Sequence, residues 1–295
     1  MDHRNGHAGR HVLAVRAAAA VARRHGLRVS EPRILSDCNN TIVHLAPLPL
    51  VAKVCHTTGR PAGPAALGRE LEIAQHLQES GAPVVPISAE VPSKVHIFET
   101  QALTFWQYRE RDLDATLNSA SAGRSLAEVH AALATYRGPL PTFIDRQVKR
   151  AGLLLAEPIS LGGLAPSDRE FLAGEHRRLT GELIGRNLLP RVLHGDPHPG
   201  NFLVSHCRHL LIDFESACLG PLEWDLSALP DGGATFPHDP DLLALLRRLR
   251  RLCAAVWCMA QAWRSPELAR SAGLHLTALR ERRHPAVDTR HLLVA

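Results

Sequence analysis

The stretch HGDPHPGN at residues 194–201 decides how the fold of this chain is interpreted, together with IDFE at residues 212–215. Between them lie two apolar runs, 202–204 and 210–212, on either side of a short polar turn. Runs of this kind around a turn predict a β-hairpin. Because the two ends of a hairpin lie close together, we expect the two polar stretches to meet at its open end.

Three polar side chains would then surround one point: Asp196, Asn201 and Asp213. Carboxylate and carboxamide oxygens are hard ligands that suit Mg²⁺, and such an ion neutralises the oxygens of a nucleoside triphosphate. A carboxylate that does not bind the metal can accept the proton of an attacking hydroxyl group. The loop therefore predicts a site for phosphoryl transfer.

The expected secondary structure of the chain changes at residues 104–108. The part before them contains short β-type runs, and the part after them is mostly helical. The expected strands are residues 41–45, 50–54 and 94–100, and the expected helices are residues 12–25, 67–78, 125–133, 167–185 and 241–263. Capping boxes at Ser125 and Ser167 predict where two of these helices start. In the last helix the leucines follow one face, and Arg247, Arg248, Arg250 and Arg251 lie mostly off it.

The two polar stretches resemble the H-G-D-x-H-x-x-N and I-D-F/W motifs of the aminoglycoside phosphotransferase and choline-kinase group, relatives of the protein kinases. GPLEWDL at residues 220–226 is similar to the group's G-x-x-x-W-D-L segment. The resemblance implies an α+β, bilobal protein-kinase-like fold. A strand-rich nucleotide-binding lobe would span residues 1–105, and a mainly helical lobe with catalysis and the acceptor pocket would span residues 106–295.

The resemblance also implies roles for residues of the second lobe. Asp196 would be the catalytic base, and Asn201 and Asp213 would hold Mg²⁺. His194 and Asp225 would support the catalytic loop structurally.

In the first lobe, VAKV at residues 51–54 is similar to the V-A-I-K strand of kinases, so Lys53 would contact the α- and β-phosphates. Its expected acidic partner on the following helix is Glu70, chosen over Glu72. A polar turn at residues 36–40 precedes this strand and lacks the glycine-rich pattern of protein kinases. Ser36 and Asn40 are the candidates for phosphate contacts in this turn.

Residues 104–108 would form the hinge between the lobes, where backbone groups bind the adenine edge. Trp106 and Tyr108 are therefore candidate nucleotide-binding residues, and Trp106 is equally consistent with a core position. The expected activity is transfer of the γ-phosphoryl group of ATP or GTP to a hydroxyl group of a small molecule.

Two other interpretations stay open at this point. One is a nucleotide-binding kinase homologue that has lost catalysis. The other is a metal-dependent hydrolase with His194, His198, Asp196 and Asp213 as ligands, since two histidines near carboxylates can bind Zn²⁺. The hydrolase would leave Asn201, Lys53 and Glu70 without a role.

The sequence does not identify the acceptor, which could be an aminoglycoside-like compound, another antibiotic or a metabolite. A cationic acceptor needs acidic residues, and Glu215 and Asp231 are the candidates; Glu215 is equally consistent with a local brace. Further acidic residues in this region are Glu223, Asp239 and Asp241. The chain has a formal net charge of +5, which argues mildly against a polycationic acceptor.

Composition limits the remaining function classes. The basic residues are almost all arginine and are spread along the chain, so we expect no nucleic-acid partner. The 6 cysteines contain no CxxC pair and predict free thiols in a reducing compartment. No apolar run has the length of a membrane span or of a signal-peptide core. We therefore expect a cytoplasmic protein without a membrane partner.

Overall fold

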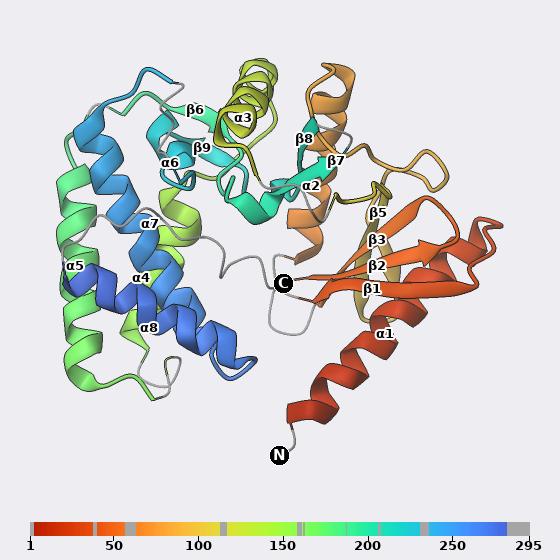
Figure 1. Cartoon of the computed structure of the whole chain (residues 1–295), viewed down its shortest axis with the longest axis horizontal. Coiled ribbons are helices and arrows are strands. Elements are labelled where there is room, and N and C mark those ends of the chain that lie inside the picture. Colours follow the sequence, from red (N-terminus) through yellow and green to blue (C-terminus); the bar gives the residue numbers. More distant parts are fainter. Residues whose placement is uncertain are drawn as a thin grey trace.

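The computed structural model describes residues 3–37, 40–56, 63–112, 117–157, 161, 163–186, 188–205, 208–230 and 236–281. The described chain forms two lobes: an antiparallel sheet with its two helices in one, and mainly helices in the other (Figure 1). The expected α+β bilobal architecture is therefore confirmed.

The sheet of the amino-terminal lobe has five antiparallel strands. In order across the sheet they are β1 (Glu31–Asp37), β2 (Asn40–Ala46), β3 (Leu50–His56), β5 (Gln101–Gln107) and β4 (His96–Phe98). Valine, isoleucine, leucine and threonine are frequent in β2, β3 and β5, as strand propensity predicts.

Helices pack on both faces of this sheet. α1 (His3–Arg24) packs a row of alanines against the face that carries Val43, Ala52 and Val54. α2 (Gly63–Glu79) packs on the other face, where Leu67 lies with Cys55 and Ala102. Successive residues of a strand point to opposite faces. Lys53, next to Val54, therefore points away from α1.

The strand register places several candidate residues on the same face as Lys53. Ser36 pairs with Ile42, Ile42 pairs with Lys53, and Lys53 pairs with Thr104. Paired residues of neighbouring strands share a face, and so do residues two apart in one strand. Asn40 and Ser36 therefore lie on the Lys53 side of the sheet.

The carboxy-terminal lobe is built from helices with two small β-ladders. Its helices are α3 (Ser119–Leu133), α4 (Lys149–Ala156), α5 (Pro166–Leu183), α6 (Leu222–Leu226), α7 (Pro240–Gln261) and α8 (Pro266–Arg280). Short helical turns are η1 (Ile144–Val148), η2 (Pro199–Asn201) and η3 (Phe214–Ser216). The ladders pair β6 (Arg191–Leu193) with β9 (Cys218–Gly220), and β7 (Phe202–Ser205) with β8 (Arg208–Leu211).

Apolar burial holds the second lobe together. Trp224 is 1% exposed and lies in the core that α4, α5, α7 and α8 share. A second core joins α3 and the β7–β8 hairpin to the end of α2, with Ile73 and Leu77 from the first lobe. The candidate catalytic loop, residues 194–201, lies between β6 and β7 and is thus supported by two packed cores.

Several element boundaries differ from the prediction. α1 begins at His3, well before residue 12, and β5 continues through Gln107. The predicted helix start at Ser125 is wrong, because α3 begins at Ser119, where the side chain of Asn118 accepts the N–H of Ser121. The predicted strand at 94–100 is replaced by the short β4 and the start of the β4–β5 turn. The predicted hairpin after residue 201 is confirmed as β7 and β8.

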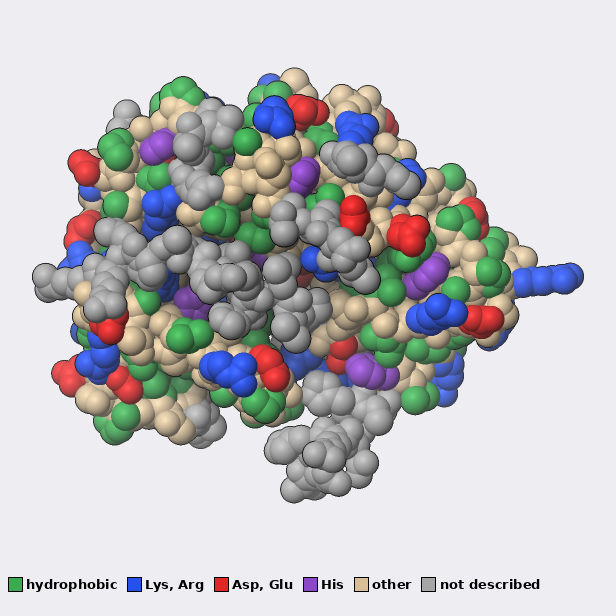
Figure 2. Space-filling model, viewed as in Figure 1, with side chains coloured by type: hydrophobic (Ala, Val, Ile, Leu, Met, Phe, Trp, Pro, Cys, Tyr) green, Lys and Arg blue, Asp and Glu red, His purple; other side chains and the backbone are tan. Residues whose placement is uncertain are grey.

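Among the described helices none is both long enough and apolar enough to cross a membrane. The described part of the chain contains four cysteines, Cys55, Cys218, Cys253 and Cys258, and all four are buried. On the face shown in Figure 2, arginine and lysine side chains are interspersed with acidic and apolar ones.

Candidate active site

The candidate catalytic loop, residues 194–201, is held at its start by Asp225 of α6. Asp225 is 0% exposed, and its carboxylate accepts the backbone N–H groups of His194 at 2.9 Å and Gly195 at 2.8 Å. His130 Nε2 lies 2.8 Å from Asp225 Oδ2. Burial alone would raise the pKa of Asp225, but its contacts with His130 hold that pKa below its ordinary value. An ionised Asp225 therefore connects the W-D-L segment to the loop.

Gly195 allows the loop to turn sharply before Asp196. Its φ is +88°, and a Cβ atom there would lie 1.9 Å from the backbone oxygen of Ser216. Both the left-handed conformation and the close approach exclude a side chain. The loop therefore requires glycine between His194 and Asp196.

His194 links the loop to the stretch at 212–215. Its ring is completely buried, with Nε2 at 3.0 Å from the carbonyl oxygen of Ile212, and Nδ1 accepts the N–H of Asp196 at 3.3 Å. Burial lowers the pKa of His194 below its ordinary value. The neutral ring thus donates from Nε2 and accepts at Nδ1, so both ring nitrogens are used within the protein.

Asp196 and Asn201 lie five residues apart in the same loop, where Asn201 is buried and Asp196 is partly exposed. Asn201 Nδ2 donates to the backbone oxygen of Asp196 at 2.9 Å, which leaves the carboxamide oxygen as the atom that can bind a ligand. The Asp196 side chain is 32% exposed, and its Oδ1 accepts from Nη1 of Arg250 at 2.8 Å. A carboxylate oxygen of Asp196 can therefore reach a molecule in solvent.

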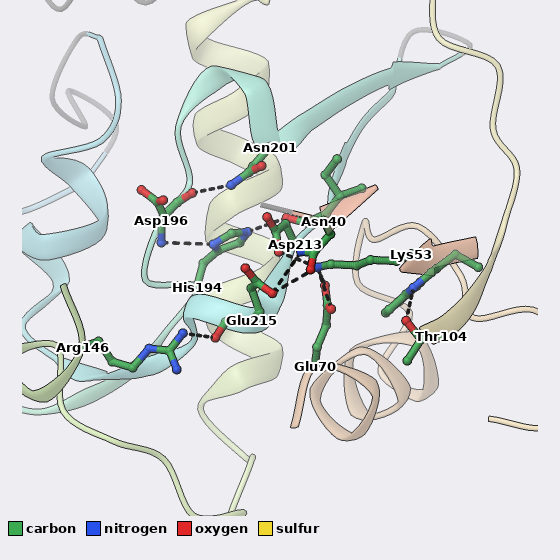
Figure 3. Close-up of polar contacts among 12 residues, drawn as sticks. Asn40, Lys53, Glu70, Thr104, Arg146, His194, Asp196, Asn201, Asp213 and Glu215 are labelled. Carbon is green, nitrogen blue, oxygen red and sulfur yellow. Dashed lines mark hydrogen bonds and ion pairs between the residues drawn. The ribbon is translucent and has the colours of Figure 1, made fainter. Parts of the chain in front are cut away.

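Lys53 joins the lobes at a buried cluster of carboxylates (Figure 3). Its Nζ lies 2.8 Å from both oxygens of Glu70, 2.7 Å from Asp213 Oδ1 and 3.8 Å from Glu215 Oε2. Burial alone would lower the pKa of Lys53, but these carboxylates raise it above its ordinary value. Burial raises the pKa of Glu70, and the contact with Lys53 acts in the opposite direction. Lys53 is therefore a fixed ammonium group at the lobe interface.

The donor set of the site fits a divalent cation beside Asp213. Glu70, Asp213 and Glu215 have oxygens within 4.8 Å of one another, but Lys53 Nζ contacts all three and neutralises much of their charge. Asp213 uses Oδ1 for Lys53, which leaves Oδ2. The backbone N–H of Ile212 donates to the backbone oxygen of Asn201 at 3.0 Å, so Asn201 lies beside the residue that precedes Asp213. The side-chain oxygens of Asn201 and Asp213 are ligands that Mg²⁺ accepts.

Asn40 and Glu215 also meet across the lobe interface. Asn40 Nδ2 donates to Glu215 Oε2 at 3.2 Å, and both residues are buried, at 5% and 8% exposed. Arg146 of η1 donates to the backbone oxygen of Glu215. Glu215 thus lies with Lys53 and Asn40, as the second of its two expected roles, a local brace, requires.

Other predicted residues lie outside this cluster. Trp106 donates from Nε1 to Thr104 Oγ1 at 3.0 Å and packs against Leu71, Ala74 and Ile87. The ring of Tyr108 stacks on His44, with ring centroids 3.8 Å apart. The Trp106 side chain is thus partly in the core. Ser36 lies on β1, four residues before Asn40, and Asp231 lies outside the described residues.

The family model described as "Phosphotransferase enzyme family" matches residues 33–269 of the chain. This range includes every residue of the site described above. The chain belongs to this phosphotransferase family. No curated protein sequence matches it. The suspected kinship with aminoglycoside phosphotransferases and choline kinases is confirmed, and the protein is an O-phosphotransferase with a nucleotide-binding, kinase-like fold.

Solved structures show the same fold at low sequence identity. An amicoumacin kinase in complex with AMP-PNP and Ca²⁺ has a TM-score of 0.69 and 15% identity, covering 95% of this chain and 97% of that one. The GDP and kanamycin complex of APH(2")-IIIa has a TM-score of 0.65 and 14% identity, covering 91% and 99%. A choline/ethanolamine kinase family protein from Mesorhizobium loti has a TM-score of 0.62 and 15% identity, covering 94% and 98%.

Membership of the phosphotransferase family contradicts the alternative interpretation as a metal-dependent hydrolase. In the described chain the group of side chains that could share a metal ion contains no histidine. His194 is fully used within the protein, and His198 Nδ1 accepts the N–H of Gly200 at 3.0 Å. These histidines hold the loop in shape and are not arranged as a zinc site.

Sequence reasoning missed one residue that the structure brings to the site. Arg250 of α7 contacts Asp196 from a position 54 residues further along the chain. Four arginines in that helix look alike in sequence, and no motif distinguishes Arg250 from the others.

Proposed function

We propose that this phosphotransferase moves the γ-phosphoryl group of ATP or GTP to a hydroxyl group of a small molecule, with Mg²⁺ as the metal and Asp196 as the base. The observation that carries the proposal is the meeting of Lys53 and Glu70 from one lobe with Asp213 from the other, next to the loop that presents Asp196. This is the set of groups that phosphoryl transfer of the kinase type needs.

Asp196 would accept the proton of the attacking hydroxyl group. Its carboxylate is partly exposed, and one of its oxygens is bonded to Arg250 while the other has no hydrogen-bond partner among the described residues. A base must reach the proton that it removes. The unbonded oxygen meets that condition.

Asn201 and Asp213 would hold Mg²⁺, through the carboxamide oxygen and Oδ2 respectively. When bound, the ion would neutralise charge on the phosphate oxygens. Lys53 would give the phosphates a further positive charge, held in place by Glu70. The Lys53 side of the sheet would line the phosphates, with Ser36 and Asn40 on it, and residues 106–108 would lie at the nucleotide base.

The acceptor is proposed only as a class, a small molecule with a hydroxyl group. Glu215 faces Lys53 and Asn40, so we assign it to bracing the lobe interface and no longer to the acceptor. Glu223 is buried, and its Oε1 accepts the backbone N–H of Asp239 at 3.0 Å. The formal net charge of +5 favours an acceptor that is not a polycation, and the nucleotide donor favours a cytoplasmic enzyme.

A coupled assay of nucleotide consumption tests the proposal. Purified protein with Mg²⁺ and either ATP or GTP is mixed with amicoumacin, kanamycin, spectinomycin, choline, ethanolamine and a wider set of hydroxyl compounds. We expect one compound to stimulate nucleotide consumption, with formation of its phosphate ester by mass spectrometry. The identity of that compound would decide between antibiotic resistance and metabolism.

Asp196→Asn is the matched variant, because it keeps the shape of the side chain and removes its basicity. It should lower the rate about 10²–10⁴-fold, the usual contribution of a general base, and leave nucleotide binding intact. Full turnover by Asp196→Asn would refute its role. Nucleotide binding without any product in the wild type would favour the inactive homologue.

A further inference from the structure

Arg250 is held beside the catalytic loop by hydrogen bonds from all parts of its guanidinium group. Nη1 donates to Asp196 Oδ1 at 2.8 Å and to Gln147 Oε1 at 3.5 Å. Nη2 donates to the backbone oxygens of Gly195 at 3.0 Å and Trp224 at 2.8 Å. Nε donates to Ser227 Oγ at 2.7 Å. No N–H group of this side chain is left without an acceptor.

The surroundings of Arg250 fix its plane as well as its hydrogen bonds. Its side chain is 11% exposed, and the guanidinium carbon lies 4.0 Å from the centre of the Trp224 ring. Stacking on an aromatic face together with a planar set of donors is specific to arginine, because a lysine ammonium is a single point charge. Arg250 is therefore a rigid part of the site.

Asp196 is the charged partner in this set, whereas the other acceptors are backbone oxygens, a carboxamide and a hydroxyl group. The hydrogen bond from Arg250 to Oδ1 restricts the rotation of the Asp196 carboxylate. The orientation of the second oxygen, Oδ2, is thereby fixed as well. The bond to the Gly195 oxygen fixes the residue before Asp196 as well. Arg250 thus defines where the carboxylate of Asp196 points.

We propose that Arg250 is a positioning residue for phosphoryl transfer, which orients the Asp196 carboxylate toward the acceptor hydroxyl group and balances its charge near the triphosphate. The inference rests on the proposed role of Asp196 as base. It goes beyond that role because it names a residue of α7 on which the base depends. Small displacements of reacting groups reduce rates strongly, about 10²-fold for 1 Å.

α7 also supplies a matched control. Arg248 lies two residues away, has a 19% exposed side chain, and forms an ion pair with Glu175 at 2.6 Å and a hydrogen bond to the Leu279 oxygen at 2.8 Å. Its partners belong to α5 and α8 and not to the catalytic loop. Removing Arg248 therefore removes a partly buried helix-to-helix ion pair without touching Asp196.

The test compares kcat, KM for the nucleotide and thermal unfolding in the wild type and in Arg250→Lys, Arg250→Ala and Arg248→Ala. We expect kcat to fall about 10–100-fold in both Arg250 variants, with KM for the nucleotide within about twofold of wild type. Arg248→Ala should lose stability and keep kcat. Millimolar guanidinium ion should restore part of kcat in Arg250→Ala and not in Asp196→Asn.

Arg250→Lys keeps the positive charge, so it remains informative if Arg250→Ala does not fold. A kcat of Arg250→Lys and of folded Arg250→Ala within about twofold of wild type would overturn the inference, and so would an equal loss in Arg248→Ala. The wild type in the same assay separates the two claims. Wild-type turnover with unchanged Arg250 variants overturns only the positioning role, whereas a wild type that binds no nucleotide and forms no product overturns the proposed function and this inference together.

Discussion

Lys53 and Asp213 are 160 positions apart in the chain, and their side chains meet at 2.7 Å. Lys53 comes from a central strand of the first lobe, and Asp213 follows the β7–β8 hairpin of the second lobe. Asp213 reaches this contact with a left-handed backbone, at φ 67° and ψ 60°. Such a conformation in a residue other than glycine costs on the order of 1–3 kcal/mol and is frequent at functional sites. The ion pair therefore connects the two lobes at the site itself.

Replacing Lys53 with methionine should strongly destabilise the protein. The change leaves the buried Glu70 and the partly exposed Asp213 without their cation, and breaking a buried pair from one side costs about 3–5 kcal/mol. Urea unfolding followed by circular dichroism measures the free energy of unfolding. Lys94→Met, at an exposed lysine, is the control and should change it by less than about 0.5 kcal/mol. Equal stabilities of the two variants would contradict the interpretation.

Asp225→Asn should weaken both the fold and turnover. The carboxylate accepts two backbone N–H groups and contacts His130, and a carboxamide would turn an N–H group toward one of these partners. We expect a loss of about 1–3 kcal/mol in the free energy of unfolding, because buried polar groups lose their partners. The exposed Asp241→Asn serves as the control. The measurements are unfolding curves and kcat for both variants. Wild-type stability and kcat in Asp225→Asn would contradict the role of the Asp225 carboxylate in holding the start of the loop.

The sequence predicts well which residues of the candidate catalytic loop lie together, because they are close along the chain. His194, Asp196 and Asn201 lie within one short stretch. The two apolar runs beside the turn predict the hairpin that brings the chain back to Asp213. The Lys53–Glu70 pair was also predicted, and the structure places these two residues in contact. A strand and the helix that follows it bring them together.

The sequence does not predict contacts that depend on how distant elements pack. Arg250 lies off the leucine face of α7, which is compatible with solvent, yet the side chain is buried against Trp224 and the loop. Glu215 likewise turns toward Asn40 because η3 follows the left-handed Asp213. The start of α3 was misplaced for a different reason. Asn118 and Ser125 are about equally good N-cap residues by type, and the helix begins at the earlier one.

Stability should fall as the pH drops below about 6.5. Burial, together with the nearby Arg251, lowers the pKa of His275 to about 4, and burial also lowers the pKa of His194. Between pH 6.5 and pH 4 the histidine binds a proton in the unfolded protein and stays neutral in the folded protein. The stabilisation is therefore complete above pH 6.5 and is lost toward pH 4. We expect His275 to account for a loss of about 1–3 kcal/mol over this range. Unfolding in urea at several pH values measures the slope, and His275→Gln should flatten it; an unchanged slope in that variant would contradict the assignment.

Gly195→Ala should damage the loop far more than a left-handed glycine alone would explain. Gly185 has a φ of +84° with nothing within 4 Å of a Cβ atom, so Gly185→Ala tests the backbone conformation by itself and should cost about 1 kcal/mol. At Gly195 the new Cβ would also meet the Ser216 oxygen at 1.9 Å, and the loop must move away from η3. That movement would displace Asp196 and break its contact with Arg250, so kcat should fall by about 10²-fold or more. Thermal unfolding and kcat of the two variants provide the measurement. If Gly195→Ala matched Gly185→Ala in both, the close approach of the loop to Ser216 would not be required for turnover.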